Sequence, residues 1–417
     1  MELYHGNIVY SKNKNELVEY ANAYIAVENG IIEGIYEQLP EKYKKLSCTD
    51  FGNDVIIPAF TDLHVHAPQY PQRSLAMDEV LVDWLDKYTF PLENKFKDIE
   101  FAKAVYDKFI DELIANGTMH AAVFGTIHNE ATGYLIEQME KKGLLAYVGK
   151  VNMDINSPDY LCEDTENSIK DTERFIDKYI NNKYAKPIIT PRFAPTCSDK
   201  LLKGLGEIGK KYNVGVQTHI EESIWESNEA LNCHPNYSCD MEIYEKAGLL
   251  DNGPVIADHF IFPKEKDIEI LNKYNGYAVQ CPEATVNIIA GIMQTGNLLD
   301  REVKIGLGSD IAAGYGLSVY SQVAKAIQLS KIKSFYEQDN RKITFAEAFC
   351  MATKGGGSLF GKVGSFEKGY SFDALVISGV SDTFEDLTPI QKVERFCGSG
   401  ETKNIKEKFI RGKKIWV

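Results

Sequence analysis

The stretch TDLHVHAPQYPQR, residues 61–73, follows an apolar run and carries two histidines two positions apart. The chain has 417 residues and only eight histidines, so two of them on one short segment call for an explanation. In a β-strand, residues i and i+2 project to the same side. We therefore expect His64 and His66 to point together from the end of a strand over residues 60–66.

Seven further strand-like apolar runs follow, and helical segments separate them. The runs cover residues 118–125, 144–152, 187–193, 213–220, 253–260, 276–281 and 303–310. Strands that alternate with helices are typical of a parallel sheet, and eight such units predict an α/β fold, the (β/α)8 TIM-type barrel. We expect this catalytic barrel over residues 59–364. The short strand-like runs of residues 1–58 and 365–417 are expected to form one small β-sandwich domain from both termini.

Polar side chains stand at the C-terminal ends of five of the eight predicted strands. In this barrel class, active sites lie at that end of the strands. The residues concerned are His64, His66, Arg192, His219, His259 and Asp310. Packing of a barrel interior does not account for this pattern, so we expect an active site there.

Four of these residues form a suitable set of metal ligands. His64, His66 and His219 supply three imidazole nitrogens, and Asp310 supplies a carboxylate oxygen. Zn²⁺ accepts this donor set, and spacing alone does not separate it from Fe²⁺. Bound zinc lowers the pKa of a water from about 15.7 to about 7. The sequence therefore predicts one Zn²⁺ per chain and a metal-activated hydroxide.

Hydrolysis also requires proton transfer, and three residues are positioned for it. Glu222 follows His219 by three residues, and Glu221 is an alternative that spacing does not exclude. His259 either binds the metal or, as we favour, orients and deprotonates the water together with Asp310. The predicted catalytic residues are thus Glu222, His259 and Asp310.

Composition narrows the possible partners. Lys and Arg number 46 against 60 Asp and Glu, a formal charge of −14, which argues against a nucleic-acid backbone. No apolar run approaches the roughly 18 residues of a membrane span. The start MELYHGNIVYSKNK lacks the features of a signal peptide, so we expect a cytoplasmic protein. The eight cysteines include no CxxC pair and are expected to be reduced.

The metal-ligand pattern resembles the amidohydrolase superfamily. Within it, five segments are similar to those of guanine deaminases: HAPQY (66–70), TPRFAPTCS (190–198), THIEE (218–222), QCPEATVNI (280–288) and GSDIAAG (308–314). The tail GYSFDALVIS (369–378) is similar to another element of the superfamily. CPEATVN departs from the family's usual CPxSN, which affects the expected substrate contacts near residues 281–287. PRF stands where a binuclear site has a carboxylated lysine, so the resemblance implies a single metal ion.

The resemblance implies hydrolysis of guanine to xanthine and ammonia, a step of purine catabolism or salvage, in a homodimer. Gln69 would pair with a ring edge, Arg192 would donate to the guanine carbonyl, and Phe193 would pack on the ring. His219 and Glu222 complete the expected substrate-binding set. Glu222 would carry a proton from the hydroxide to the ring and the leaving amine.

Two alternatives remain at this point, and a third is rejected. The same metal set suits a deaminase or hydrolase of another purine, a pterin or a triazine-like heterocycle. A non-enzymatic binding barrel would leave the metal ligands without a role. The tripeptide His219-Ile220-Glu221 matches H-x-E of the deaminases that act on nucleic acids, but no P-C-x-x-C follows it.

Residues 71–100 form a long excursion after the first strand, which we expect to cover part of the pocket.

Overall fold

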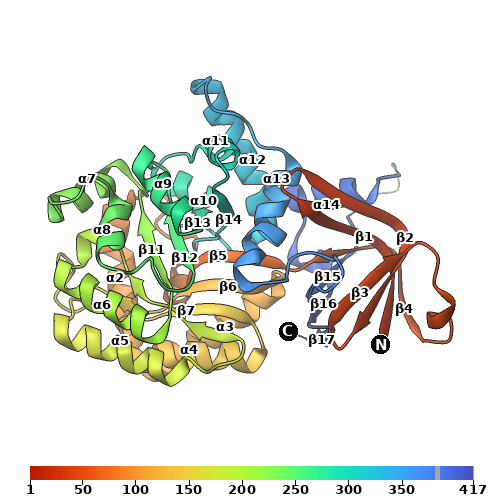
Figure 1. Ribbon diagram of the computed structural model, residues 1–417, viewed down its shortest axis with the longest axis horizontal. Coiled ribbons are helices and arrows are strands. Elements are labelled where there is room, and N and C mark those ends of the chain that lie inside the picture. Colours follow the sequence, from red (N-terminus) through yellow and green to blue (C-terminus); the bar gives the residue numbers. More distant parts are fainter. Residues whose placement is uncertain (381–385, 417) are drawn as a thin grey trace.

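The structure is a computed structural model that describes residues 1–380 and 386–416. Its core is a closed barrel built from two four-stranded parallel sheets, β5-β6-β7-β9 and β11-β12-β13-β14. A parallel bridge between Ile189 and Val216 joins the sheets at one seam. At the other seam, the Asp310 N–H donates to the His64 carbonyl at 2.9 Å. The predicted barrel is therefore confirmed (Figure 1).

The barrel strands lie close to the predicted runs. They are β5 (Phe60–His66), β6 (Thr118–Phe124), β7 (Leu145–Gly149), β9 (Ala185–Pro187), β11 (Val216–Ile220), β12 (Val255–His259), β13 (Tyr277–Gln280) and β14 (Lys304–Leu307). The short pair β8 (Val151–Asn152) and β10 (Thr190–Pro191) extends two of them. All seven residues of β5 are buried, which explains its nearly continuous apolar sequence.

Most of the helices cover the outside of the barrel. Those of eight or more residues are α3 (Ile99–Ala115), α4 (Asn129–Lys142), α5 (Thr165–Tyr179), α6 (Asp199–Tyr212), α7 (Ile224–Cys233), α9 (Glu265–Lys273), α12 (Val319–Tyr336) and α14 (Pro389–Ser399). The shorter ones are α1 (Leu81–Trp84), α2 (Phe90–Glu93), α8 (Asp240–Lys246), α10 (Pro282–Asn287), α11 (Thr295–Asp300) and α13 (Phe345–Cys350). No helix of the described residues is long and apolar enough to cross a membrane.

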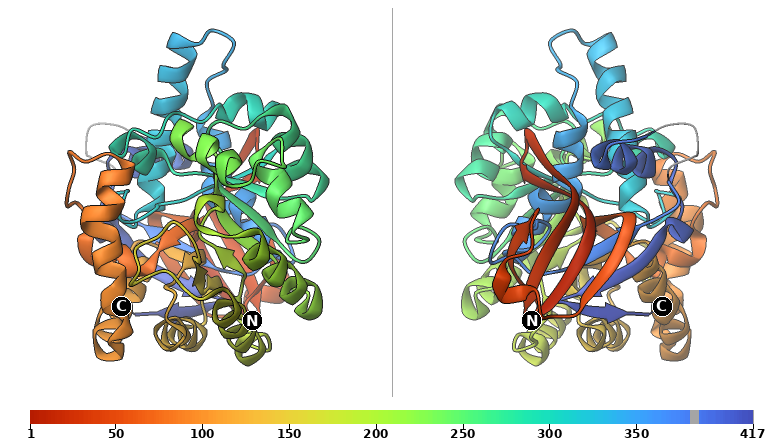
Figure 2. Two further views of the ribbon diagram at one scale, coloured as in Figure 1. Left: turned by 90° about the vertical axis from the view of Figure 1, so that its left-hand side faces the viewer. Right: turned by 90° about the vertical axis from the view of Figure 1, so that its right-hand side faces the viewer.

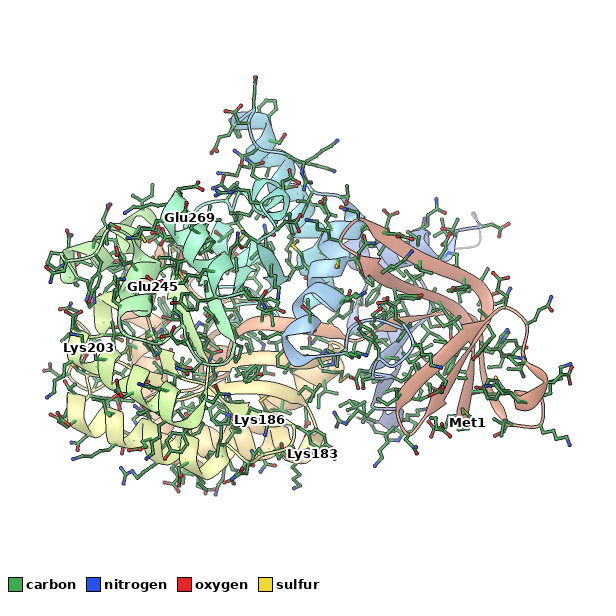
Figure 3. All side chains as sticks on the ribbon, viewed as in Figure 1. Met1, Lys183, Lys186, Lys203, Glu245 and Glu269 are labelled. Carbon is green, nitrogen blue, oxygen red and sulfur yellow. The ribbon has the colours of Figure 1, made fainter. Side chains whose placement is uncertain are left out.

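Helix α6 shows how sequence sets the orientation of this outer layer. Ser198 caps its first turn by accepting from the Leu201 N–H at 3.1 Å. Leu201 and Leu205 are buried against the barrel, while Lys203 between them is exposed. Figure 3 shows Lys203 on the outside of the molecule, as it does Glu269 of α9. Apolar residues that recur with the helical period of 3.6 therefore place one face of each such helix against the core.

The two ends of the chain form one seven-stranded sheet beside the barrel. Its order is β17-β16-β15-β4-β1-β2-β3. The strands are β1 (Glu2–Asn13), β2 (Glu16–Glu28), β3 (Ile31–Tyr36), β4 (Cys48–Pro58), β15 (Ala374–Ile377), β16 (Ile405–Ile410) and β17 (Lys413–Ile415). The expected small β domain from both termini is present, but its strands form one twisted sheet and not two stacked sheets, seen face-on in the right-hand view of Figure 2. The predicted domain boundaries, after residue 58 and before residue 365, stay a prediction. Residues 381–385 and 417 of the predicted terminal segment lie outside the described residues.

A buried hydrogen bond connects this sheet to the barrel. His120, on β6, has its Nε2 at 3.2 Å from Asp373 Oδ2, directly before β15. Its Nδ1 lies 3.1 Å from Thr61 Oγ1 on β5. His120 is therefore a satisfied core histidine and has no part in the active site.

All eight cysteines are free.

Candidate active site

Side chains from four strand ends meet at the mouth of the barrel. His64 and His66 come from β5, His219 from β11, His259 from β12, and Asp310 follows β14. Two overlapping groups, His64–His66–His219 and His64–His259–Asp310, each place their ligand atoms within 4.8 Å of one another. All five side chains are buried. The structure thus brings together every residue that the sequence assigned to the metal.

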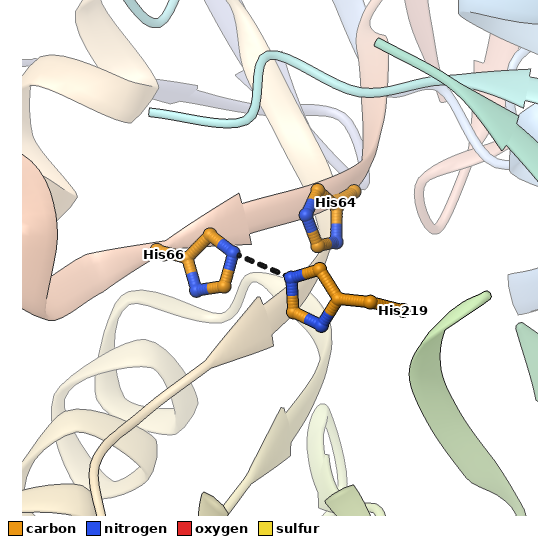
Figure 4. Close-up of side chains that lie close together, drawn as sticks. All are labelled: His64, His66 and His219. Carbon is orange, nitrogen blue, oxygen red and sulfur yellow. Dashed lines mark hydrogen bonds between the residues drawn. The ribbon is translucent and has the colours of Figure 1, made fainter. Parts of the chain in front are cut away.

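The closest approach in this cluster is between two imidazole rings. His66 Nε2 and His219 Nε2 lie 3.1 Å apart, as Figure 4 shows beside His64. His219 Nδ1 lies 2.7 Å from the Arg192 carbonyl oxygen, which can only accept, so Nδ1 carries the hydrogen. In neutral His219, Nε2 is consequently a bare lone pair directed at His66.

The electrostatics of the histidines suit a cation. Burial, followed by the positive charge of His64, lowers the pKa of His66 and His219 well below the usual range. Burial also lowers the pKa of His259, and neither of its ring nitrogens has a hydrogen-bond partner in the described residues. Neutral imidazoles with free lone pairs are the form that binds metal ions. These residues therefore fit a bound metal ion.

Two carboxylates complete the cluster. Asp310 Oδ1 lies 3.2 Å from His64 Nε2 and 3.5 Å from His66 Nε2. Asp258 Oδ1 lies 3.1 Å from His64 Nδ1, on the other side of that ring. Burial alone lowers the pKa of His64, but the two carboxylates together raise it well above its usual value. Two carboxylates around one ring thus favour positive charge at this position.

Asp258 was missed by sequence reasoning, although it directly precedes His259. Neighbouring residues of a strand point to opposite faces, so only one of the two was expected at the site. His259 has a φ of +70°, in the left-handed region, which turns the chain at the end of β12. Both side chains consequently reach the cluster. Such strained backbone is found preferentially at functional sites.

The two glutamates after β11 point in different directions. Glu222 Oε1 lies 3.5 Å from His259 Nε2, and its side chain lines the pocket. Glu221 instead accepts a hydrogen bond from the Ser227 hydroxyl on α7. Burial, with a smaller contribution from Asp310, raises the pKa of Glu222 to about 8. Of the two, only Glu222 is placed to exchange protons at the site.

A pocket opens directly above the cluster. Its lining combines polar groups with apolar side chains: His66, Gln69, Leu81, Trp84, Leu85, Arg192, Phe193, His219, Glu222, Ile288, Asp310 and Ala313. Leu81, Trp84 and Leu85 belong to the excursion after β5. That segment therefore forms part of the pocket wall, as the sequence analysis expected. Ile288 directly follows CPEATVN (281–287), the segment in which the sequence departs from the family pattern.

Arg192 and Gln69 are held by a buried carboxylate that the sequence analysis did not identify. Glu93 Oε2 accepts from Arg192 Nη1 at 2.7 Å, and Oε1 accepts from Nη2 at 3.2 Å. Gln69 Nε2 donates to the same Oε1 at 3.0 Å. Phe193 lies 7% exposed beside them, its ring centroid 6.5 Å from that of Trp225. No sequence motif in the excursion after β5 predicts a role for Glu93.

Comparison with known proteins agrees with this geometry. The amidohydrolase family model matches residues 55–415. The chain is 32% identical to a guanine deaminase of Dictyostelium discoideum, over 100% of this chain and 98% of the relative. It is 34% identical to the guanine deaminase of Homo sapiens, over 90% and 85% of the two chains. The chain belongs to the amidohydrolase family, in its guanine deaminase branch.

A solved structure extends the match to the whole fold. The guanine deaminase of C. acetobutylicum, determined with guanine bound in its active site, is 41% identical and superposes with a TM-score of 0.97. The alignment covers 100% of both chains. An amidohydrolase barrel with its accompanying sheet is therefore the architecture of this chain from end to end.

Proposed function

We propose that this protein hydrolyses guanine to xanthine and ammonia, with one Zn²⁺ bound per chain. The observation that carries the proposal is the position of Arg192, Gln69 and Phe193 in the pocket that opens onto the His–Asp cluster. A flat, polar-edged heterocycle suits that lining. Support comes from the 41% identical relative, whose structure contains guanine.

In this proposal His64, His66, His219 and Asp310 hold the metal. Zinc, when bound, supplies a water that is acidic enough to react near neutral pH. Asp258 positions the His64 ring from behind, through the 3.1 Å contact at Nδ1. The Arg192 carbonyl fixes the tautomer of His219, as the 2.7 Å contact indicates. His64 and His219 therefore each have a partner that orients the ring.

Glu222 carries the protons. Deamination forms a bond from the water oxygen to C2 of guanine and breaks the bond from C2 to the amino nitrogen. The Glu222 carboxylate accepts a proton from the water, delivers it to the ring nitrogen, and assists protonation of the departing amine. A pKa raised to about 8 suits a group that must accept and release protons near neutrality. His259 and Asp310 orient the water.

Arg192, Gln69 and Phe193 bind the purine. The Arg192 guanidinium donates to the carbonyl oxygen of guanine, and the Gln69 amide pairs with a ring edge. Phe193 offers an aromatic face to the ring. Trp84, Leu81 and Leu85 close the apolar side of the pocket and keep bulk water away from the reacting carbon.

Ammonia release from a panel of aminated heterocycles tests the choice of substrate. The panel contains guanine, 8-oxoguanine, an amino-substituted pterin and an aminotriazine, each at the same concentration. The proposal expects kcat/KM for guanine to exceed that of the others by at least about tenfold. Faster turnover of another member would assign the site to that heterocycle instead.

Two finer parts of the proposal rest on sequence resemblance and composition. They are a homodimeric assembly and a cytoplasmic location. Light scattering on the purified protein should give a mass near twice the 46.9 kDa of one chain. A mass of one chain at micromolar concentration would contradict the dimer.

A further inference from the structure

Glu93 links the two polar side chains that are expected to contact the substrate. It is the last residue of α2, within the excursion after β5, and only 3% of it is exposed. Its carboxylate accepts two hydrogen bonds from Arg192 and one from Gln69. Neither partner can change orientation without breaking at least one of these contacts.

The contact with Gln69 decides which end of its amide faces which neighbour. A carboxylate only accepts hydrogen bonds, so the amide NH2 group must face Glu93. Gln69 Oε1 then accepts from the Ala312 N–H at 3.2 Å. One N–H and one oxygen lone pair of the amide remain for a ligand. Glu93 thereby selects one of two amide orientations that have opposite donor and acceptor patterns.

The contact with Arg192 is bidentate and buried. Distances of 2.7 Å and 3.2 Å join its two terminal nitrogens to the two oxygens of Glu93. The guanidinium also lies 5.1 Å from the centroid of the Phe90 ring. A long side chain with many rotamers is thus reduced to one position, in which its remaining N–H groups are available to the pocket. Its charge is balanced, which removes the penalty of an unpaired buried cation.

We propose that Glu93 is a positioning residue that sets substrate specificity for a lactam edge, meaning a ring carbonyl beside a ring N–H. This inference rests on the proposed function. Glu93 acts through Arg192 and Gln69, holding the donor of one and the amide of the other in the pattern that such an edge requires. Removing its charge releases both partners at once.

The test compares guanine with 2-aminopurine, which has the same amino group but no carbonyl. Glu93→Gln is the variant, because it keeps the shape and presents a donor where a carboxylate oxygen accepted. Glu163→Gln is the matched control, since Glu163 also pairs with a buried cation, Lys150, but does not line the pocket. kcat, KM and zinc content are measured for all three proteins.

We expect Glu93→Gln to raise KM for guanine by about tenfold or more, with a smaller change in kcat. The ratio of kcat/KM for guanine to that for 2-aminopurine should fall by about tenfold or more, because the lost contacts concern only the carbonyl edge. Zinc content should not change. Glu163→Gln should leave that ratio at the wild-type value, whatever it does to thermal stability.

An unchanged ratio in folded Glu93→Gln, even with lower activity on both substrates, would overturn the inference, since a purely structural role lowers both equally. If Glu93→Gln does not fold, Glu93→Asp supplies the same readout. Aspartate retains the negative charge on a shorter side chain. The ratio of kcat/KM for guanine to that for 2-aminopurine should therefore lie between the wild-type value and the value of a protein without selectivity. A wild-type ratio in Glu93→Asp would contradict the inference. Wild-type protein that releases no ammonia from guanine would instead contradict the proposed function.

Discussion

His66 Nε2 and His219 Nε2 lie 3.1 Å apart, although 153 positions separate the two residues along the chain. The Nδ1–H of His219 donates to the Arg192 carbonyl, so His219 Nε2 presents a lone pair toward His66. His66 Nε2 donates to that lone pair when it carries a hydrogen, and without that hydrogen the two nitrogens can share a cation. The pair therefore offers two adjacent ligand atoms for a metal ion.

Removing either ring of this pair should empty the site. We expect the wild-type protein to contain about one zinc per chain by elemental analysis, and His66→Ala or His219→Ala to contain less than about half of that. His5→Ala is the matched control, because His5 contacts Asp50 in the terminal sheet, far from the cluster along the chain. Full zinc occupancy in His66→Ala would contradict the assigned ligands.

Glu222→Gln should abolish most of the activity and leave metal binding intact. General acid–base groups contribute about 10²- to 10⁴-fold to a rate, and kcat should fall by that amount. Guanine binding, followed by equilibrium dialysis, should persist, since the amide has nearly the same shape.

Glu221→Gln is the control for this prediction. Its side chain bonds to Ser227 and does not line the pocket, so kcat should fall less than about tenfold. A larger loss of kcat in Glu221→Gln than in Glu222→Gln would reverse the two assignments.

The barrel and the metal ligands were accessible from sequence because both follow simple periodic rules. Strand β5 (Phe60–His66) occupies the predicted residues, and HVH within it satisfies the i, i+2 rule. His219, His259 and Asp310 each end an apolar run, and parallel strands bring such ends to one side of a barrel. Short-range pattern and fold class together were sufficient to place these side chains near one another.

Asp258 and Glu93 were not accessible for different physical reasons. Strand alternation places Asp258 opposite His259, and only the left-handed turn at His259 brings both to the site. Glu93 belongs to a segment with no strand or long helix, whose path is set by packing over the barrel mouth. The choice between Glu221 and Glu222 depended on one backbone angle, a φ of +54° at Glu221, that spacing does not encode.

Asp258→Asn should weaken metal binding without removing a ligand. The 3.1 Å contact to His64 Nδ1 orients that ring, and loss of such a partner lowers metal affinity by about 10- to 100-fold. Competition with a zinc chelator of known affinity measures the change. Equal zinc affinity in Asp258→Asn and wild type would show that Asp258 does not orient His64.

His128, outside the site, should make stability depend on pH. Burial, reinforced by the charges of Lys150 and Lys97, lowers the pKa of His128 from 6.5 to about 4. Between these values the unfolded chain binds a proton that the folded chain does not, so this contribution to stability is present above pH 6.5 and is lost as pH falls toward 4. His128→Gln lacks this titration.

The difference in Tm between wild type and His128→Gln is the relevant measurement, because effects shared by both proteins cancel. Wild-type Tm minus variant Tm should be nearly constant from pH 7.5 to about pH 6.5 and should then decrease as the pH is lowered to 5. A difference that is constant over this range would contradict the lowered pKa.

Guanine turnover by the purified protein, before and after metal removal, is the decisive test of metal-dependent deamination. Loss of guanine absorbance and release of ammonia are followed together in the untreated, chelated and zinc-restored protein. We expect xanthine and ammonia in equal amounts, loss of both after chelation, and recovery when zinc is added. Guanine turnover that persists at the same rate in fully metal-free protein, or no turnover of guanine in zinc-loaded protein, would contradict this expectation.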